Sequence, residues 1–251
     1  MVVQIFTSVV NRPDFVKIQD DLFKKFLKED YQFNIVDDSV DESISKQFYN
    51  ICSENRFKYY KKSKRTIEMN PAQACADTVQ WSYDNIIRKN HLGDIVFFCD
   101  SDLFLIDDFN ISEYMEDAII AGLPQYRGNV TYMWNGIMVF NMPKINDLDI
   151  DFSDGIVEDE MTDVGGNTYY YFKRNNITMK ETDVQYPTHF NDIELQNDEV
   201  TKGYNFELHL DGKFLHYRAA TNWHSNWRDS KDPLTKKTKI FNTIIGELLN
   251  V

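Results

Sequence analysis

Cysteine is scarce in this chain: its 251 residues include only Cys52, Cys75 and Cys99. The number is odd and the spacing matches no metal motif, so we expect neither a disulfide framework nor a cysteine zinc site. A chain of this length buries enough surface to fold without such cross-links. The first ten residues have neither a cationic stretch nor a small-residue cleavage site, so no signal peptide is expected. Together these features favour a cytoplasmic protein.

Long apolar runs and an excess of basic residues are also lacking. No apolar stretch approaches the roughly 18 residues of a membrane-spanning helix, so we expect no membrane span. Lys and Arg total 27 against 40 Asp and Glu, which gives a formal charge of −13. This charge repels polyphosphate and attracts divalent cations, which argues against a nucleic acid as partner.

With only ten glycines and six prolines, the chain has the composition of an ordinary globular protein. The first hundred residues alternate strand and helix patterns, which is typical of a mostly parallel sheet. The run 95–99 is apolar at every position, which predicts a central strand covered on both faces. Strands are expected at 2–9, 31–39, about 57–60 and 95–99, with helices from residue 13, over 43–55 and over 71–87.

The second part of the chain has shorter strand patterns, at 118–123 and 133–140, and helix patterns at 166–173 and 233–249. Residues 206–217 predict a hairpin, because Asp211-Gly212 supplies the positive φ of a two-residue turn. No linker divides the chain. The sequence therefore predicts one α/β domain over 1–251, with a mostly parallel central sheet flanked by helices, a smaller mixed sheet and a C-terminal helix.

Two carboxylates follow the apolar run directly, in Asp100-Ser101-Asp102. Open α/β sheets bind ligands at the carboxyl ends of their strands. Carboxylates two residues apart at such a position suit a hard divalent cation that holds a diphosphate. The alternative is a polar turn that ends a strand, since a single D-x-D is common in an acidic protein.

The segment GDIVFFCDSDLFLIDD (93–108) resembles the metal-binding D-x-D segment of GT-A glycosyltransferases, a Rossmann-like fold. Other segments resemble that fold in the same order: TSVVNRPDF (7–15), NIVDDSVDES (34–43) and WNGIMVFN (134–141). HYRAATNW (216–223) is similar to the late His motif of glycosyltransferase family 8, whereas the front half looks more like family 2. The family 8 motif carries a phosphate-binding Lys, and here Arg218 stands as its replacement.

The resemblance implies metal-dependent transfer of a sugar from a nucleotide-diphosphate sugar to a glycan or other acceptor. A UDP-sugar is favoured, because an Asp accepts the imide N–H of uracil, and a GDP-sugar is the alternative. Residues 1–102 would form the nucleotide-binding half and 103–251 the acceptor-binding half. The metal, Mn²⁺ or Mg²⁺, would be held by Asp100, Asp102 and His216, with Mn²⁺ preferred by imidazole.

The resemblance also assigns residues to the two substrates. The nucleotide residues implied are Thr7, Ser8, Asn11, Arg12, Asp37, Asp38, Asp100, Ser101 and Arg218. For the sugar and acceptor they are Trp134, Asn135, Gly136 and Trp223. For each single Trp the alternative is core packing.

Asp163 is the first candidate for the catalytic base. It precedes two glycines and the predicted start of a helix, where backbone can approach a ligand closely. Family 8 enzymes place an active-site Asp in this region. The alternative is that Asp163 caps the helix, in which case Glu158, Asp159 or Glu160 is the next candidate.

Three other functions compete with this prediction. A haloacid-dehalogenase-type phosphatase carries its D-x-D near the N-terminus with Thr or Val two positions on, whereas Phe104 stands there in this chain. A nucleotidyltransferase opens with a Gly-rich loop, and residues 1–14 contain no Gly. A sugar-binding module without turnover stays open.

The basic run Lys61-Lys62-Ser63-Lys64-Arg65 is expected to face solvent.

Overall fold

The computed structural model describes residues 2–62, 69–197, 205–218, 220 and 231–250. The chain folds into two compact units. Unit 1 comprises Met1–Pro13, Glu29–Ser101 and Asn110–Thr182, and unit 2 comprises Asp14–Lys28, Asp102–Phe109 and Asp183–Val251. The chain therefore passes between the units several times. The nucleotide-binding half 1–102 and the acceptor-binding half 103–251 stay a prediction.

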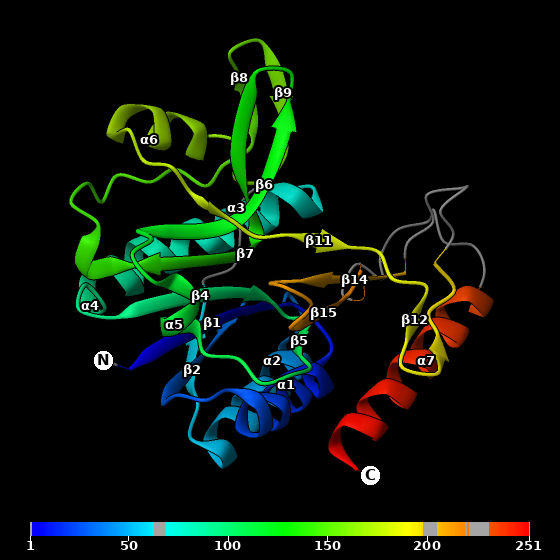
Figure 1. Cartoon of the computed structure of the whole chain (residues 1–251). Coiled ribbons are helices and arrows are strands. Elements are labelled where there is room, and N and C mark those ends of the chain that lie inside the picture. The colour runs from blue at the N-terminus through cyan, green and yellow to red at the C-terminus, as the bar shows by residue number, and fades with distance from the viewer. Residues whose placement is uncertain (1, 63–68, 198–204, 219, 221–230, 251) are drawn as a thin grey trace. The chain divides into compact units, whose positions relative to one another are not determined.

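Unit 1 is built on a seven-stranded sheet with the strand order β10-β6-β7-β4-β1-β2-β3 (Figure 1). Strand β1 pairs in parallel with β2 and β4, as do β2 with β3 and β10 with β6. Strand β7 is antiparallel to both of its neighbours. The mostly parallel sheet is thus confirmed. Its strands are β1 (Val3–Val9), β2 (Tyr31–Asp37), β3 (Lys58–Lys61), β4 (Ile95–Asp100), β6 (Ile120–Arg127), β7 (Val130–Asn141) and β10 (Lys180–Glu181).

The strand patterns at 118–123 and 133–140 belong to this central sheet as β6 and β7, and both strands are longer than their patterns. β7 covers one edge of β4 and β1 covers the other. Residues 95–99 of β4 are all buried, as the apolar run predicts. A hairpin of β8 (Gly155–Val157) and β9 (Glu160–Thr162) forms a separate two-stranded sheet.

The helices of unit 1 begin at local signals. The Asp41 side chain accepts from Ser43 N–H at the start of α2, and Asn70 and Gln73 form a capping box at the start of α3. The helix expected over 71–87 changes to a π-helical turn at Tyr83. The helical segments are α2 (Glu42–Asn55), α3 (Pro71–Ser82), η1 (Tyr83–Ile87), α4 (Arg88–Asn90), α5 (Ile111–Met115), η2 (Met142–Lys144) and α6 (Thr168–Asn175).

One part of the core of unit 1 lies between the sheet and α3. Phe98 of β4, Phe140 of β7 and Phe152 pack edge-to-face or tilted with ring centroids 6.0–6.4 Å apart. Tyr83 joins them at 5.4 Å from Phe152. These large aromatic side chains are almost fully buried, and together they fix the side of the sheet that α3 covers.

Unit 2 is built on a four-stranded sheet with the order β11-β14-β15-β5, and all its pairings are antiparallel rather than mixed. Phe206, Leu215 and Tyr217 of this sheet pack with Phe15 of α1 and Phe241 of α7 in one apolar cluster. The elements are α1 (Pro13–Phe26), β5 (Leu103–Leu105), β11 (Val184–Gln185), β12 (His189–Phe190), β13 (Ile193–Glu194), β14 (Phe206–His209), β15 (Phe214–Tyr217) and α7 (Lys231–Leu249).

The hairpin turn of unit 2 corrects one prediction. His209 pairs with Phe214, so the loop has four residues, 210–213, and not two. Leu210, Asp211 and Gly212 all have positive φ. Asp-Gly therefore supplies the expected conformation, but Leu210 extends the turn. In the described part of the chain, no helix is both long and apolar enough to cross a bilayer.

Candidate functional site

The carboxyl ends of three parallel strands bring polar residues to one edge of the unit 1 sheet. The backbone register pairs Ser8 with Asp100 and Val9 with Asp37. Thr7, which is 1% exposed, precedes Ser8 on β1, and its buried Oγ1 has no hydrogen-bond partner among the described residues. The nucleotide residues expected from β1, β2 and β4 thus share this edge. Ser101 follows Asp100 and is buried.

Asn11 and Arg12 follow β1 in the turn before α1. Arg12 has a φ of 63°, in the left-handed region that a non-glycine residue seldom adopts. Pro13 comes next, and proline further restricts the residue before it. Such strain is concentrated at functional sites, which makes this turn notable beside the strand ends. Asn11 and Arg12 are both partly exposed.

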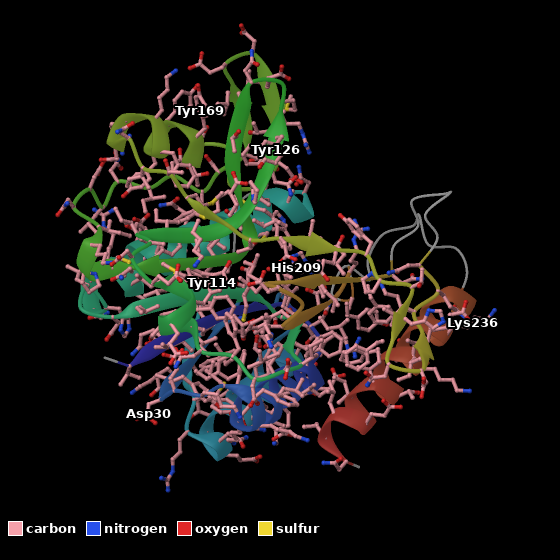
Figure 2. The ribbon with its side chains drawn as sticks, in the orientation of Figure 1. Asp30, Tyr114, Tyr126, Tyr169, His209 and Lys236 are labelled. Atoms are coloured by element: carbon pink, nitrogen blue, oxygen red, sulfur yellow. The ribbon has the colours of Figure 1, made fainter. Side chains whose placement is uncertain are left out.

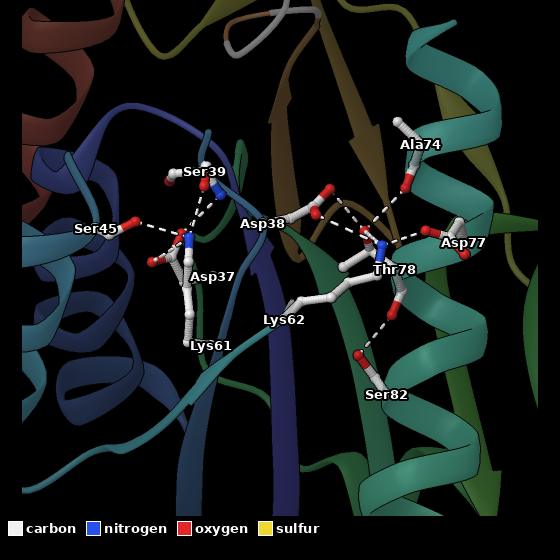
Figure 3. Close-up of polar contacts among 10 residues, drawn as sticks. All are labelled: Asp37, Asp38, Ser39, Ser45, Lys61, Lys62, Ala74, Asp77, Thr78 and Ser82. Atoms are coloured by element: carbon white, nitrogen blue, oxygen red, sulfur yellow. Dashed lines mark hydrogen bonds and ion pairs between the residues drawn. The ribbon is translucent and has the colours of Figure 1, made fainter. Parts of the chain in front are cut away.

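Asp37 is fully enclosed at the end of β2 (Figure 3). Its carboxylate accepts from Ser39 N–H at 2.7 Å and Tyr59 O–H at 2.7 Å, and Lys61 Nζ lies 3.2 Å away. Burial raises the pKa of Asp37, but the hydrogen bonds from Ser39 and Tyr59 outweigh burial, so the pKa lies below its ordinary value. Asp37 is therefore a charged acceptor whose partners are internal.

Asp38 belongs to a second buried group beside helix α3 (Figure 3). Its Oδ2 accepts from Thr78 Oγ1 at 2.9 Å, and its Oδ1 lies 3.5 Å from Lys62 Nζ. Lys62 also pairs with Asp77. The prediction that the run 61–65 faces solvent is wrong for Lys62, which is 5% exposed, because two carboxylates balance its buried charge. Residues 63–65 lie outside the described part of the chain.

The Trp134-Asn135-Gly136 segment lies on β7. A Cβ on Gly136 would lie 2.1 Å from Cη2 of Trp134, so the indole ring lies along the strand over the glycine. Trp134 is partly exposed. Asn135 is 2% exposed and donates to the Phe152 carbonyl at 3.1 Å, and its Oδ1 has no hydrogen-bond partner in the described residues.

Asp163 is exposed and lies in the turn before α6. The turn is tight, because a Cβ on Gly165, at φ +86°, would lie 1.9 Å from the Met133 carbonyl oxygen. Asp163 Oδ1 accepts from Val164 N–H at 2.8 Å. The helix begins at Thr168, two residues later than expected, and its N-cap is Asn167. Asp163 therefore does not cap α6.

The alternative bases lie in the β8–β9 hairpin. Glu158 and Asp159 form its turn with positive φ. Glu158 pairs with Lys173 at 2.8 Å, and the hydrogen bond from Lys173 lowers the pKa of Glu158, which makes it a weaker base. Glu160 is partly exposed and lies where a Cβ on Gly128 would contact its carboxylate.

In unit 2, strand alternation places polar side chains on the sheet face opposite the apolar cluster. Glu207 and His209 are two residues apart on β14, and Glu207 pairs directly with His216 of β15. Figure 2 labels His209 among these side chains. All three are buried, at 7%, 0% and 7% exposed, and their ligand atoms lie within 4.8 Å of one another. This is a buried group that could hold a metal ion.

Glu207 is the centre of this group. Its Oε2 lies 2.9 Å from His216 Nδ1 and 3.3 Å from His209 Nε2, and its Oε1 lies 2.9 Å from Arg218 Nε. Burial raises the pKa of Glu207, but hydrogen bonds from both histidines and the charge of Arg218 lower it well below its ordinary value. The side chain of Arg218 is 40% exposed.

Asp102 lies on the other side of the His216 ring. Its Oδ1 is 3.5 Å from His216 Nε2, and its Oδ2 accepts from Ala220 N–H at 3.0 Å. Burial lowers the pKa of His216, but the carboxylates of Asp102 and Glu207 outweigh burial and raise it to about 9. The structure thus brings together Asp102 and His216, as the resemblance implied, although their role as metal ligands stays a prediction.

Sequence reasoning missed Glu207 and His209. The alternation of Phe206, Glu207, Leu208 and His209 was the available signal, because it places both polar side chains on the face of His216. Trp223, an expected acceptor residue, lies outside the described residues.

Comparisons with known proteins find distant likenesses of fold. No family model and no curated protein matches the chain. Among solved structures, S. aureus TarS is 15% identical with a TM-score of 0.39, over 61% of this chain and 50% of that one. The mannosyltransferase PcManGT from Pyrobaculum calidifontis, in complex with GDP-Man and Mn²⁺, is 10% identical with a TM-score of 0.40, over 55% and 44%.

The WbbM bifunctional glycosyltransferase is 13% identical with a TM-score of 0.37, over 57% of this chain and 32% of that one. This chain therefore spans between about a third and a half of the length of these three solved chains.

Proposed function

We propose that this chain is a metal-dependent glycosyltransferase that moves a sugar from a nucleotide-diphosphate sugar to a glycan acceptor. The observation that carries the proposal is the pair Asp102 and His216. Residues far apart in sequence, one ending a D-x-D and one in a late His motif, lie 3.5 Å apart in a buried polar group. A carboxylate and an imidazole whose other ring nitrogen is hydrogen-bonded to a second carboxylate is a donor set that suits a divalent cation.

The two ligand atoms fit a divalent cation. Ligands at roughly 2.1 Å from one ion, at angles of about 90–110°, lie about 3.0–3.5 Å from each other. The separation of 3.5 Å between His216 Nε2 and Asp102 Oδ1 lies in this range and is long for a hydrogen bond. We assign the ion to these atoms, with Asp100, two residues before Asp102 in the chain, as a third ligand. Mn²⁺ is favoured over Mg²⁺, because imidazole is a softer ligand than oxygen.

The bound cation would neutralise the charge that develops on the leaving diphosphate. Arg218 supports the same charge. Its Nε lies 2.9 Å from Glu207 Oε1 and its side chain is 40% exposed, and a guanidinium fork is well suited to phosphate oxygens.

The nucleoside is assigned to the strand ends of unit 1. The proposed acceptor of the base N–H is Asp37 or Asp38, the two carboxylates at the end of β2, and both already hold internal donors. A uracil imide N–H suits a single carboxylate oxygen, which favours a UDP-sugar, and a GDP-sugar is the alternative. The other residues proposed to line this part of the site are Thr7, Ser8, Asn11, Arg12, Asp100 and Ser101.

The sugar and the acceptor are assigned to β7 and to the turn before α6. The partly exposed Trp134 ring, which Gly136 lets lie along the strand, offers an apolar face for a sugar. Asn135, which follows Trp134 on β7, is proposed to hydrogen-bond the sugar. Trp223 is proposed as a further residue that contacts the sugar or acceptor. Asp163 is proposed as the base that takes the acceptor proton, because it is exposed and does not cap α6.

A thermal-shift panel of UDP- and GDP-sugars with Mn²⁺ tests the proposal. A donor at 100 times its Kd adds about 2.7 kcal/mol, which raises Tm by about 5–10 °C in a chain of this size. We expect one nucleotide class to give this shift with Mn²⁺, and Asp102→Asn to lose it. Asp107→Asn, an exposed carboxylate of the same unit, is the matched control. The proposal is wrong if no donor shifts Tm, or if Asp102→Asn responds like the control.

A further inference from the structure

We infer that Glu207 and His209 are positioning residues that hold His216 with its Nε2 turned toward Asp102. The inference rests on the proposed metal site and concerns how this chain builds it. Glu207 contacts both His216 and His209. The proposed ion needs neither Glu207 nor His209 as a ligand.

The hydrogen bonds of His216 fix the direction of its ring. When a cation binds Nε2, the ring proton must be on Nδ1, and Glu207 Oε2 accepts it at 2.9 Å. A carboxylate behind a metal-bound imidazole holds the tautomer and raises the basicity of the ligand nitrogen. Glu207 and His216 are direct cross-strand neighbours, so the strands themselves keep this bond in place.

Both oxygens of Glu207 are already occupied by protein donors. Oε1 lies 2.9 Å from Arg218 Nε, while Oε2 serves both imidazoles. An ion on Glu207 would have to displace two N–H donors beside a fixed guanidinium charge. Among the described residues, the only donor at Asp102 Oδ1 is His216 Nε2, at 3.5 Å. The geometry therefore places the ion on the Asp102 side of the ring.

His209 acts one step further back. His209 is fully buried, and its Nε2 lies 3.3 Å from Glu207 Oε2. Val184 of the neighbouring strand β11 pairs with His209, so β14 is flanked by another strand at this position. A carboxylate accepts hydrogen bonds, so His209 Nε2 is the donor of this bond. That bond limits the rotation of Glu207, which in turn holds His216.

Mn²⁺ affinity, measured by electron paramagnetic resonance of the free ion in the full chain without donor sugar, tests the inference. We expect Glu207→Gln to weaken Mn²⁺ binding 10–100-fold, because it keeps the shape but puts an N–H₂ against N–H donors. His209→Phe should weaken binding in the same direction, whereas His209→Gln, which keeps an N–H at the same reach, should bind within about threefold of wild type. Glu194→Gln and His189→Gln are matched controls, because this exposed cross-strand pair lies on β12 and β13 of the same unit.

Three results separate the possibilities. If wild type binds Mn²⁺ and Glu207→Gln binds it equally well, the positioning role is wrong while the proposed function stands. If Glu207→Gln and His209→Gln abolish binding while Asp102→Asn keeps it, the ion is held by Glu207, His209 and His216 themselves, which also overturns the inference. If wild type does not bind Mn²⁺, the metal site of the proposed function is wrong, and the inference that rests on it is wrong with it. Circular dichroism of each variant shows that a loss is not unfolding, and the His209→Gln rescue tests the role if His209→Phe misfolds.

Discussion

At the scale of single residues, Asp163 is an exposed carboxylate whose Oδ1 receives the N–H of Val164 at 2.8 Å. Asp163→Asn keeps the volume of the side chain and removes its charge and basicity. We expect turnover to fall by about 10²–10⁴, the usual worth of a positioned base, with nucleotide and Mn²⁺ binding unchanged. Steady-state kinetics and a binding titration on the same variant measure both effects.

The control for Asp163 is Glu158→Gln, because Glu158 is occupied by Lys173. Full transferase activity in Asp163→Asn would exclude it as the base, and Glu160 or a group of the acceptor itself would then take its place.

Asp37 predicts a pH dependence of stability. Its folded pKa lies below the ordinary value of 3.8, so its contribution is complete above that value and is lost as the pH falls through the folded pKa. We expect Asp37→Asn to destabilise the protein by about 1–3 kcal/mol at neutral pH, because buried donors lose a charged acceptor. Urea denaturation between pH 2 and 7 should show the difference from wild type shrinking in acid. The prediction is contradicted if the stability difference between wild type and Asp37→Asn does not change with pH. It is also contradicted if the exposed control, Asp117→Asn, lowers the free energy of unfolding by the same amount.

Residue types predicted part of the site and not all of it. The D-x-D and the late His were visible in the sequence, since each is a local motif beside a strand. The burial of Lys62 was not, because it depends on Asp38 and Asp77, which come from other elements. Charge runs look alike in sequence whether solvent or carboxylates balance them.

At the scale of elements, the turn before α6 depends on Gly165. A Cβ there would meet the Met133 carbonyl at 1.9 Å in addition to the cost of φ +86°. We expect Gly165→Ala to cost about 2–5 kcal/mol of unfolding free energy. Gly212→Ala is the matched control: φ is +78°, yet the nearest atoms would lie 4.0 Å away, so only about 1–2 kcal/mol is expected. Chemical denaturation measures both, and equal costs would show that the close approach to Met133 is unimportant.

Helices and strands could be predicted where their pattern of apolar residues is long and uninterrupted. β1, β2 and β4 and helices α1 and α2 lie close to their predicted positions, because apolar spacing and caps act locally. The sheet to which β6 and β7 belong, and the four-residue loop at 210–213, were not predictable from local pattern. Both depend on pairing with distant strands, which is decided by tertiary packing.

At the scale of the whole molecule, an acidic chain with a formal charge of −13 attracts divalent cations to its entire surface. The total amount of bound Mn²⁺ therefore does not report on the proposed site. The occupancy of that site is the amount of bound Mn²⁺ that Asp102→Asn removes. This part should persist at 0.5 M salt, because a buried site is screened far less than surface charge. Titrations of wild type and Asp102→Asn at low and high salt separate the two contributions, and a site that salt abolishes would contradict the buried assignment.

Release of nucleoside diphosphate from a nucleotide sugar tests the central claim most directly. The chain is incubated with each UDP- and GDP-sugar, with Mn²⁺ or with a chelator, and the free diphosphate is measured over hours. A glycosyltransferase with its metal on Asp102 and His216 should slowly hydrolyse one donor, only with Mn²⁺, and at least 100-fold more slowly after Asp102→Asn or His216→Gln. Donor binding without diphosphate release under any condition would identify a sugar-binding module, and release that is unaffected by chelator and by both variants would contradict the proposed site.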